Sequence, residues 1–201
     1  MARLEFFFDC SSPWTYLAFH RIEGLAAETG AALEWRPFLV GGVFNTVNPS
    51  VYEQRTRPVA AKARYYVKDL QDWARHYDLR IGSPRVFPVN SVKAMRGCLV
   101  ALEHDRLPIY ARKVFETYWG DLEDISQDQV LERIVRHAGL DVPSFFAKIT
   151  APAYKEKLRA NTDELVARGG FGSPTLFVDG DDMYFGNDRL VLVRDALLRR
   201  Q

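Results

Sequence analysis

A short aromatic run followed at once by a helix start is the feature that most limits how this chain can fold. The run Leu4–Phe8 is apolar and aromatic, which is typical of a buried strand. Ser12 and Pro13 then predict a helix that begins there, because serine caps a free amide and proline has no amide to satisfy. Leu33–Phe38 alternates apolar and polar residues, as a half-buried strand does. Strand, helix and strand with short connections indicate a βαβ unit with a right-handed crossover.

The rest of the chain is a long helical stretch followed by a second, shorter pair of strands. Helices are predicted over Val59–Tyr77, Val92–His104, Ile109–Trp119, Asp128–His137 (with a capping box of Ser126 and Gln129), from Pro143, and over Pro152–Ala167. Two strands, Pro174–Val178 and Met183–Phe185, and a final helix opened by Gly186-Asn187-Asp188 follow. The order βαβ, helical block, ββα predicts an α/β, thioredoxin-like fold with a large all-helical insertion. Residues 1–38 and 169–201 would form the thioredoxin-like domain and residues 39–168 the inserted helical domain.

Composition excludes several classes of function. A formal net charge of +1 and the lack of a Lys/Arg cluster argue against nucleic-acid binding. No apolar stretch approaches the roughly 20 residues that span a bilayer, and the first residues lack the pattern of a secretion signal, so we expect a cytoplasmic protein that binds no membrane. Cys10 and Cys98 are expected to be reduced thiols, the latter in the core. The four histidines have no metal-ligand spacing, and we expect no metal site.

The turn between the first strand and the first helix is the first candidate site. A thioredoxin-type oxidoreductase carries two cysteines, Cys-x-x-Cys, at this helix start, where the helix dipole stabilises a thiolate. Here the four positions are Ser12, Pro13, Trp14 and Thr15, so no disulfide can form between them. A helix start that offers amides and a hydroxyl suits a thiolate brought by a ligand, and glutathione is the common cytosolic candidate. The alternative is that Ser12 serves only as a helix cap.

Further candidates lie where the fold places loops beside that turn. Pro174 stands where thioredoxin-like folds carry a cis-proline, so the main chain of Ser173 is expected to hold the cysteinyl part of glutathione, unless the proline is trans at an edge strand. The stretch Phe185–Asp188 offers amides to a carboxylate and an acid to an ammonium group, or only a cap. Asn48, in a predicted long loop over Gly41–Pro49, and Lys62 are candidates for the glycyl end, although a single lysine is usually only solvated.

These residues together resemble the 2-hydroxychromene-2-carboxylate isomerases and the kappa-class glutathione transferases of the DsbA-type thioredoxin superfamily. The resemblance runs from end to end and is carried by the motifs within Phe8–Trp14, Arg36–Gly42, Lys62–Leu70, Phe87–Asn90, Trp119-Gly120, Phe171–Thr175 and Gly186–Leu190. The family implies that Ser12 faces the glutathione sulfur. It implies a glutathione pocket formed by Asn48, Lys62, Ser173, Pro174, Phe185, Gly186, Asn187 and Asp188, and second-substrate contacts by Asn90 and Trp119.

The resemblance also implies an activity. It implies a homodimeric, glutathione-dependent isomerase that converts a 2-hydroxychromene-2-carboxylate-like substrate to trans-o-hydroxybenzylidenepyruvate in aromatic (naphthalene) degradation, with a small aromatic carboxylate as the partner of glutathione. A kappa-type transferase or peroxidase that consumes glutathione shares the catalytic serine and stays open. A non-catalytic thioredoxin-like binding module that has lost its cysteines is the alternative of another class.

Overall fold

A computed structural model describes residues 1–200 of the chain. In chain order its elements are β1 (Arg3–Phe8), α1 (Pro13–Thr29), β2 (Ala32–Pro37), α2 (Val40–Val47), α3 (Ser50–Thr56), α4 (Ala60–His76), α5 (Val92–Glu103), α6 (Leu107–Phe115), the π-helical turn η1 (Glu116–Gly120), α7 (Asp128–His137), α8 (Val142–Thr150), α9 (Pro152–Ala167), β3 (Thr175–Val178), β4 (Asp182–Phe185), the 3₁₀ turn η2 (Asn187–Arg189) and α10 (Leu190–Leu198).

The four strands form one mixed sheet in the order β2-β1-β3-β4. β1 runs parallel to β2, with Phe6 opposite Trp35, and antiparallel to β3, with Phe6 also opposite Leu176. β3 and β4 form an antiparallel hairpin. The predicted βαβ and ββα units are therefore both present and share one sheet, and the predicted thioredoxin-like fold with its large helical insertion is confirmed.

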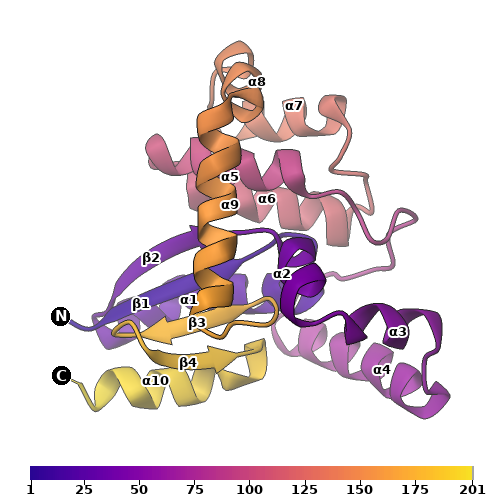
Figure 1. Cartoon of the computed structure of the whole chain (residues 1–201), viewed down its shortest axis with the longest axis vertical. Coiled ribbons are helices and arrows are strands. Elements are labelled where there is room, and N and C mark those ends of the chain that lie inside the picture. The colour runs from indigo at the N-terminus through magenta and orange to yellow at the C-terminus, as the bar shows by residue number, and fades with distance from the viewer. Residues whose placement is uncertain (201) are drawn as a thin grey trace.

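The central strand β1 is covered on both faces. Phe6 and Phe8 belong to the main core, with residues of α1 and α10, whereas Phe7 belongs to a smaller cluster on the other face, with Leu165 of α9 and Val43 of α2. Successive side chains of a strand point to opposite faces, so three consecutive phenylalanines require cover on both sides. Figure 1 shows this arrangement, with α9 crossing the sheet opposite α1 and α10.

A buried ion pair fastens α9 to the sheet. Glu5 of β1 is buried and pairs with Arg168, the residue that follows α9. Arg168 also pairs with Glu164 at 2.8 Å and donates to the carbonyl of Gly180 at 2.7 Å. A buried carboxylate without such partners would strongly destabilise the fold. The end of the insertion is thus held at a fixed place against β1.

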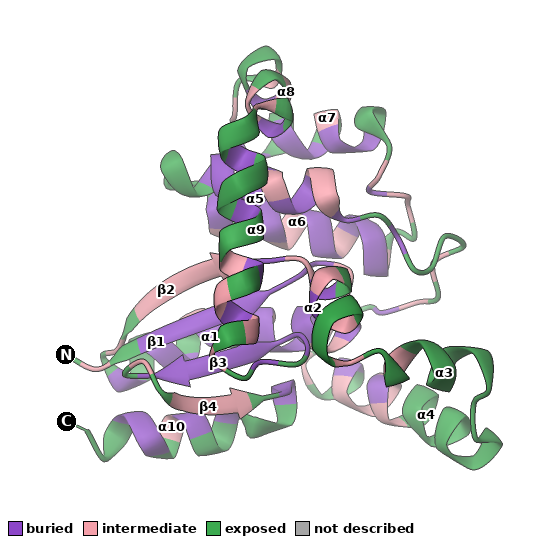
Figure 2. Ribbon diagram, viewed as in Figure 1, coloured by how far each residue is buried: buried purple, intermediate pink, exposed green. Residues whose placement is uncertain are grey.

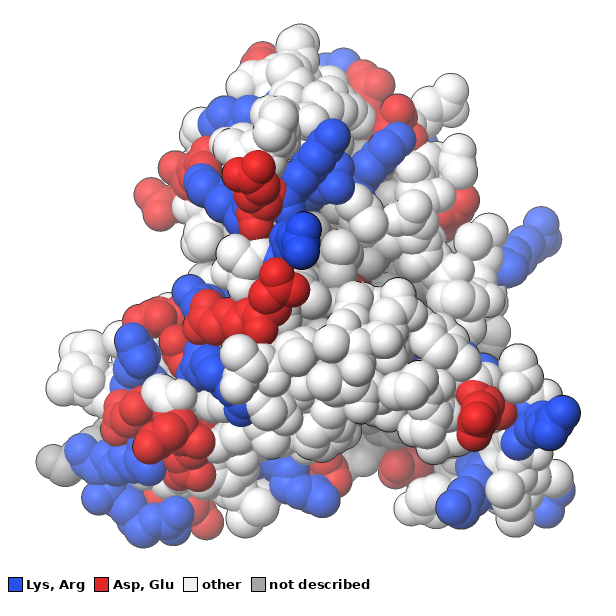
Figure 3. Space-filling model, in the orientation of Figure 1, with Lys and Arg blue, Asp and Glu red and all other residues white. Residues whose placement is uncertain are grey.

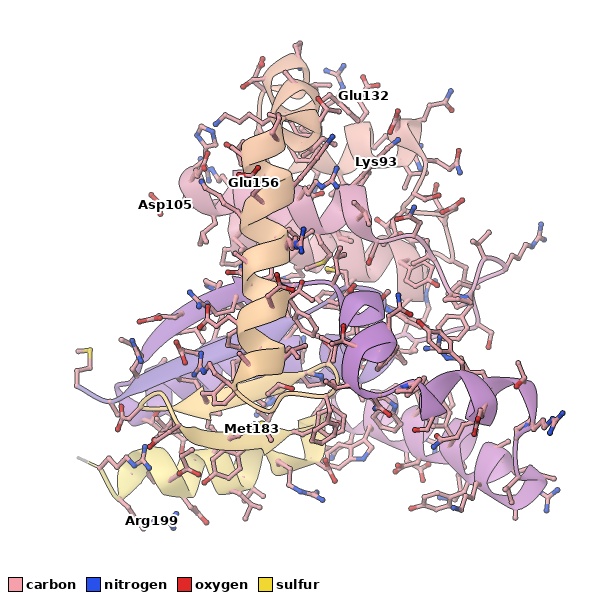
Figure 4. All side chains as sticks on the ribbon, viewed as in Figure 1. Lys93, Asp105, Glu132, Glu156, Met183 and Arg199 are labelled. Carbon is pink, nitrogen blue, oxygen red and sulfur yellow. The ribbon has the colours of Figure 1, made fainter. Side chains whose placement is uncertain are left out.

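The insertion forms a helical block beside one end of the sheet. Many of its buried residues, among them Leu131 of α7 and Phe145 of α8, belong to the same apolar core as Phe6. Figure 2 shows buried positions along α6 and α7 of this block. Lys93, Glu132 and Glu156 lie on this block, away from the strands (Figure 4). The division into domains at residues 38 and 169 stays a prediction, and Gln201, which it includes, lies outside the described residues.

The structure differs from the prediction in two places within the insertion. Residues 41–49 were predicted as a loop, but most of them form α2, and α3 follows directly. This helix depends on tertiary contact: the amide of Leu39 donates to the Thr162 hydroxyl at 3.1 Å, and a Cβ on Gly42 would lie 3.0 Å from Cγ2 of Thr162. The predicted capping box of Ser126 and Gln129 is also wrong, because Gln127 is the N-cap residue and makes no side-chain cap.

Candidate active site at the start of helix α1

Ser12 lies where β1 ends and α1 begins. It adopts an extended conformation (φ −105°, ψ 124°) and caps the helix by accepting a hydrogen bond from the amide of Thr15 at 3.3 Å. Its hydroxyl also donates to the carbonyl of Ser173 at 3.1 Å. Pro13 follows as the first helical residue, so the first turn leaves amides directed at the site. Ser12 can therefore cap the helix and still present its hydroxyl at the site.

The loop before β3 is fastened to this helix start. The Ser173–Pro174 peptide bond is cis, as predicted. The Ser173 hydroxyl accepts from the amide of Asp9 at 3.0 Å and lies 2.7 Å from the hydroxyl of Thr15. Together with the bond from Ser12, three hydrogen bonds link the cis-proline loop to the turn, and they place the main chain of Ser173 beside the Ser12 hydroxyl.

Beneath the turn lies the fully buried carboxylate of Asp9. It accepts from the amides of Ser11 and Val40, both at 2.9 Å, and from the Ser91 hydroxyl at 3.1 Å. Burial raises the pKa of Asp9 above its usual range, and the bonds from Ser11 and Val40 partly offset the rise. Val40 is the first residue of α2 and Ser91 the N-cap residue of α5. One side chain thus connects the turn, α2 and α5.

The turn opens into a cavity of about 1030 Å³ between the sheet end and the arm formed by α3 and α4. Six predicted site residues line it: Ser12, Asn48, Lys62, Asn90, Ser173 and Phe185. Its apolar wall includes Trp14, Phe44, Tyr52, Tyr66, Phe87 and Phe171. Trp14 and Tyr66 make an edge contact with ring centroids 5.3 Å apart, and Phe171 lies 4.5 Å from Phe185. A cavity of this size with an aromatic wall suits a flat organic ligand beside a peptide.

Trp119 does not lie where it was predicted. Its side chain is 3% exposed and does not line the cavity, because it lies under the turn, where Nε1 donates to the carbonyl of Cys10 at 2.9 Å. Its ring is 6.1 Å from that of Phe87, a cavity residue. Trp119 therefore supports the wall of the cavity, and its contact with a second substrate stays a prediction.

The η2 stretch flanks the cavity without lining it. Asn187 is buried, and its side-chain nitrogen has no partner. Asp188 pairs with Arg189 at its own turn. Gly186 has a positive φ of 101°, and a Cβ there would lie 2.7 Å from Oδ1 of Asp188, so glycine is required. Of the predicted γ-glutamyl residues, Phe185 alone reaches the cavity.

The charge of the cavity was not predicted from the sequence. Besides Lys62, its lining contains Arg55 and Arg57, and it contains no Asp or Glu. Figure 3 shows few charges over the neighbouring face of α2, whereas Lys and Arg alternate with Asp and Glu over the helical block. A lining with cations and no acids favours an anionic ligand. Single arginines on short helices give no sequence signal, which is why Arg55 and Arg57 were missed.

The resident thiols do not belong to this chemistry. Cys10 and Cys98 are both fully buried and free. Burial raises the pKa of the Cys10 thiol well above its usual range, and the neighbouring Cys98 raises it further. A nucleophilic cysteine requires an exposed, low-pKa thiolate, so neither thiol fits that role. Within residues 1–200, no group of three or more His, Cys, Asp or Glu is arranged to hold a metal ion, and no helix is long and apolar enough to cross a bilayer.

The fold and this site are those of a thioredoxin-like protein without redox cysteines at the helix start. A family model described as a DSBA-like thioredoxin domain matches residues 3–198, and the chain belongs to that family. The chain is 31% identical over 199 residues to a 2-hydroxychromene-2-carboxylate isomerase of Pseudomonas sp. (strain C18), with 96% of this chain and 89% of that protein covered. It is 28% identical over 210 residues to glutathione S-transferase kappa 1 of Homo sapiens, covering 96% and 90%. A solved 2-hydroxychromene-2-carboxylate isomerase has a TM-score of 0.84 to this chain at 28% identity, covering 98% and 95%. The family resemblance stated from the sequence is confirmed.

Replacing Asp9 tests whether its carboxylate holds the site together. Asp9→Ala leaves two buried amides without an acceptor, so we expect the free energy of unfolding in urea to fall by about 2–4 kcal/mol. Ser91→Ala removes one donor only and should cost about 1 kcal/mol. A loss no larger in Asp9→Ala than in Ser91→Ala would contradict this role.

The same variant has a predicted pH dependence. Because the pKa of Asp9 is raised in the folded protein, the folded state binds a proton at higher pH than the unfolded chain does. The wild-type protein is therefore stabilised relative to Asp9→Ala as the pH falls from neutral toward the usual aspartate value of 3.8. Urea unfolding at several pH values should show the difference between the two proteins increasing on acidification.

Proposed function

We propose that this protein is a glutathione-dependent isomerase that converts 2-hydroxychromene-2-carboxylate-like substrates to trans-o-hydroxybenzylidenepyruvate in aromatic degradation. The observation that carries the proposal is a capped helix start without redox cysteines that opens into a cavity lined by cations and aromatic rings. The names of relatives that match nearly the whole chain support the same activity.

The residues at the turn fit a bound thiolate. Glutathione would supply a sulfur nucleophile for reversible addition to the unsaturated substrate and would be regenerated. The Ser12 hydroxyl, which donates to the Ser173 carbonyl, turns its hydrogen toward the sulfur, while the helix dipole favours the anion. The main chain of Ser173 holds the cysteinyl unit in the manner of strand addition. Asn48 and Lys62 are assigned to the glycyl end. The stretch Phe185–Asp188, of which Phe185 lines the cavity and the rest flanks it, is assigned to the γ-glutamyl end.

Two other activities fit parts of the site. A kappa-type transferase or peroxidase would use the same Ser12 and consume glutathione, and relatives named glutathione S-transferase kappa 1 support that candidate. A binding module without catalysis would use the edge beside Pro174 and ignore glutathione. The cavity, with its cations and aromatic wall, favours an enzyme that binds a small anionic second substrate over a peptide-binding module.

Thiol stoichiometry separates the three candidates. We expect 2-hydroxychromene-2-carboxylate to be turned over only in the presence of glutathione, while the concentration of free thiol, measured with a thiol reagent, stays constant. Consumption of about one thiol per turnover would instead establish transferase chemistry. Absence of glutathione binding by calorimetry at millimolar concentration would refute both enzymatic candidates.

Ser12→Ala tests the assigned donor. Losing a hydrogen bond directed at the sulfur should lower kcat by about 10²-fold or more, whereas stability should fall by only about 1 kcal/mol through the lost cap. Ser11→Ala removes the hydroxyl of the preceding residue, which also lines the cavity, and should cost much less activity. Activity of Ser12→Ala within twofold of wild type, or a larger loss in Ser11→Ala, would show that the sulfur is not held by Ser12.

We also propose that the protein works as a cytoplasmic homodimer. The support is the family resemblance and, for the compartment, two buried free thiols that suit a reducing environment. Tyr65 on α4, which is 63% exposed, is chosen as a candidate contact residue. Sedimentation equilibrium should give twice the chain mass, and Tyr65→Glu should shift it toward the monomer. Val191→Glu changes a residue of α10 with 61% exposure and should leave the dimer intact. A wild-type monomer would refute the proposed dimer. Enzyme recovered outside the cytoplasm on cell fractionation would refute the proposed location.

A further inference from the structure

Arg55 is held in the cavity by aromatic rings. Its guanidinium carbon lies 5.5 Å from the ring centroid of Phe44 on α2 and 5.3 Å from that of Phe87, in the segment between α4 and α5. Both rings line the cavity. A cation against an aromatic face is attracted to it even at an exposed site, so the planar group has a preferred place between the two rings.

The rings themselves are supported from below. Phe87 lies against Trp119, whose indole nitrogen is bonded to the Cys10 carbonyl of the catalytic turn. The neighbouring Tyr118 hydroxyl donates to the carbonyl of Val86 at 2.8 Å. Trp119 and Tyr118 both belong to the π-helical turn η1, a form often found beside functional sites. Contacts from Arg55 to Phe87, from Phe87 to Trp119 and from Trp119 to the turn thereby connect the position of Arg55 with that of Ser12.

No carboxylate neutralises Arg55 within the described residues. Cations elsewhere in the chain are commonly paired, as in Arg36 with Glu164 and Lys93 with Asp128. The charge of Arg55 acts inside the cavity: desolvation raises the pKa of Tyr66, and Arg55 opposes that rise. Tyr66 in turn contacts Trp14, two residues from Ser12. The site therefore presents an unpaired, oriented guanidinium within its aromatic wall.

The charges of the proposed ligands match this arrangement. Bound glutathione with an ionised sulfur has two carboxylates, one thiolate and one ammonium group, and is doubly negative. An aromatic carboxylate adds a third negative charge, and the cavity lining provides three cations, Arg55, Arg57 and Lys62. Arg55 alone of the three is flanked by rings, which can contact a flat aromatic ligand while the guanidinium pairs with its carboxylate.

We propose that Arg55 binds the carboxylate of the second substrate and selects planar aromatic carboxylates over neutral aromatic compounds. This inference rests on the proposed function, because it assigns the second ligand of the same site. Arg55 contacts substrate, whereas Phe44, Phe87 and Trp119 act as positioning residues.

The test compares a charged and a neutral probe of the same shape. Calorimetric titrations with naphthalene-2-carboxylate and naphthalene-2-carboxamide are made on wild type, Arg55→Gln, Arg55→Lys and Arg64→Gln, each with and without saturating glutathione. Arg64→Gln removes the same charge from exposed α4, outside the cavity lining, and serves as the matched control.

We expect Arg55→Gln to bind the carboxylate about 10- to 100-fold more weakly, from loss of a charge-assisted bond, with carboxamide and glutathione affinities within about twofold of wild type. The affinity of Arg55→Lys for the carboxylate should lie between those of wild type and Arg55→Gln, because lysine keeps the charge but lacks the planar guanidinium. In turnover assays, KM for 2-hydroxychromene-2-carboxylate should rise in Arg55→Gln with an unchanged glutathione half-saturation. Unchanged thermal unfolding confirms that the variants are folded.

Three results overturn the inference: a wild type without preference for the carboxylate, a preference retained in Arg55→Gln, or an equal loss in Arg64→Gln. Failure of the proposed function has a different signature. If glutathione does not bind the wild type, the proposed function is wrong, but a carboxylate preference that disappears in Arg55→Gln in the titrations without glutathione still supports the assignment of Arg55.

Discussion

The buried carboxylate of Asp9 is the interaction on which the site depends. It joins three segments that are distant in sequence: the turn before α1, the first residue of α2 and the N-cap residue of α5. Burying a carboxylate is costly, and the raised pKa of Asp9 records that cost. Its hydrogen bonds with Ser11, Val40 and Ser91 compensate for the desolvation. The cavity walls contributed by α2 and by the segment before α5 thus keep a fixed relation to Ser12.

The same geometry explains how a thioredoxin-like helix start can work without cysteines. The dipole of α1, its free first-turn amides and the cis-proline loop are properties of the backbone, and they remain when the side chains change. Ser12 replaces the usual thiol with a donor that can face a sulfur but cannot form a disulfide. Cys10, two residues earlier, is directed into the core instead. Under the proposed function, the position of the redox cysteine becomes the place for an external thiolate.

Local signals predicted much of the fold, and long-range contacts explain what they missed. The cap at Ser12 depends on a few adjacent residues, and the cis-proline at Pro174 follows from its place in the predicted fold, so both could be predicted from the sequence. α2 could not, because its two glycines disfavour a helix that forms only against Thr162 of α9. The family resemblance placed Trp119 near the site without showing that its ring lies beneath the turn. Nothing local shows that the cation at position 55 lies between two distant phenylalanines.

The two sides of the cavity are built differently. On the sulfur side, Asp9, Thr15 and Ser173 are buried and joined by hydrogen bonds, so a substitution there disturbs several elements at once. On the opposite side, α3 has no buried residue, and α4 buries only Leu70 and Ala74, which follow its cavity residues along the helix (Figure 2). Exposed positions tolerate substitution with little loss of stability. The proposed place of the thiolate thus lies on the side that is tightly hydrogen-bonded, and the proposed contact of Arg55 with the second substrate lies on the side that tolerates substitution.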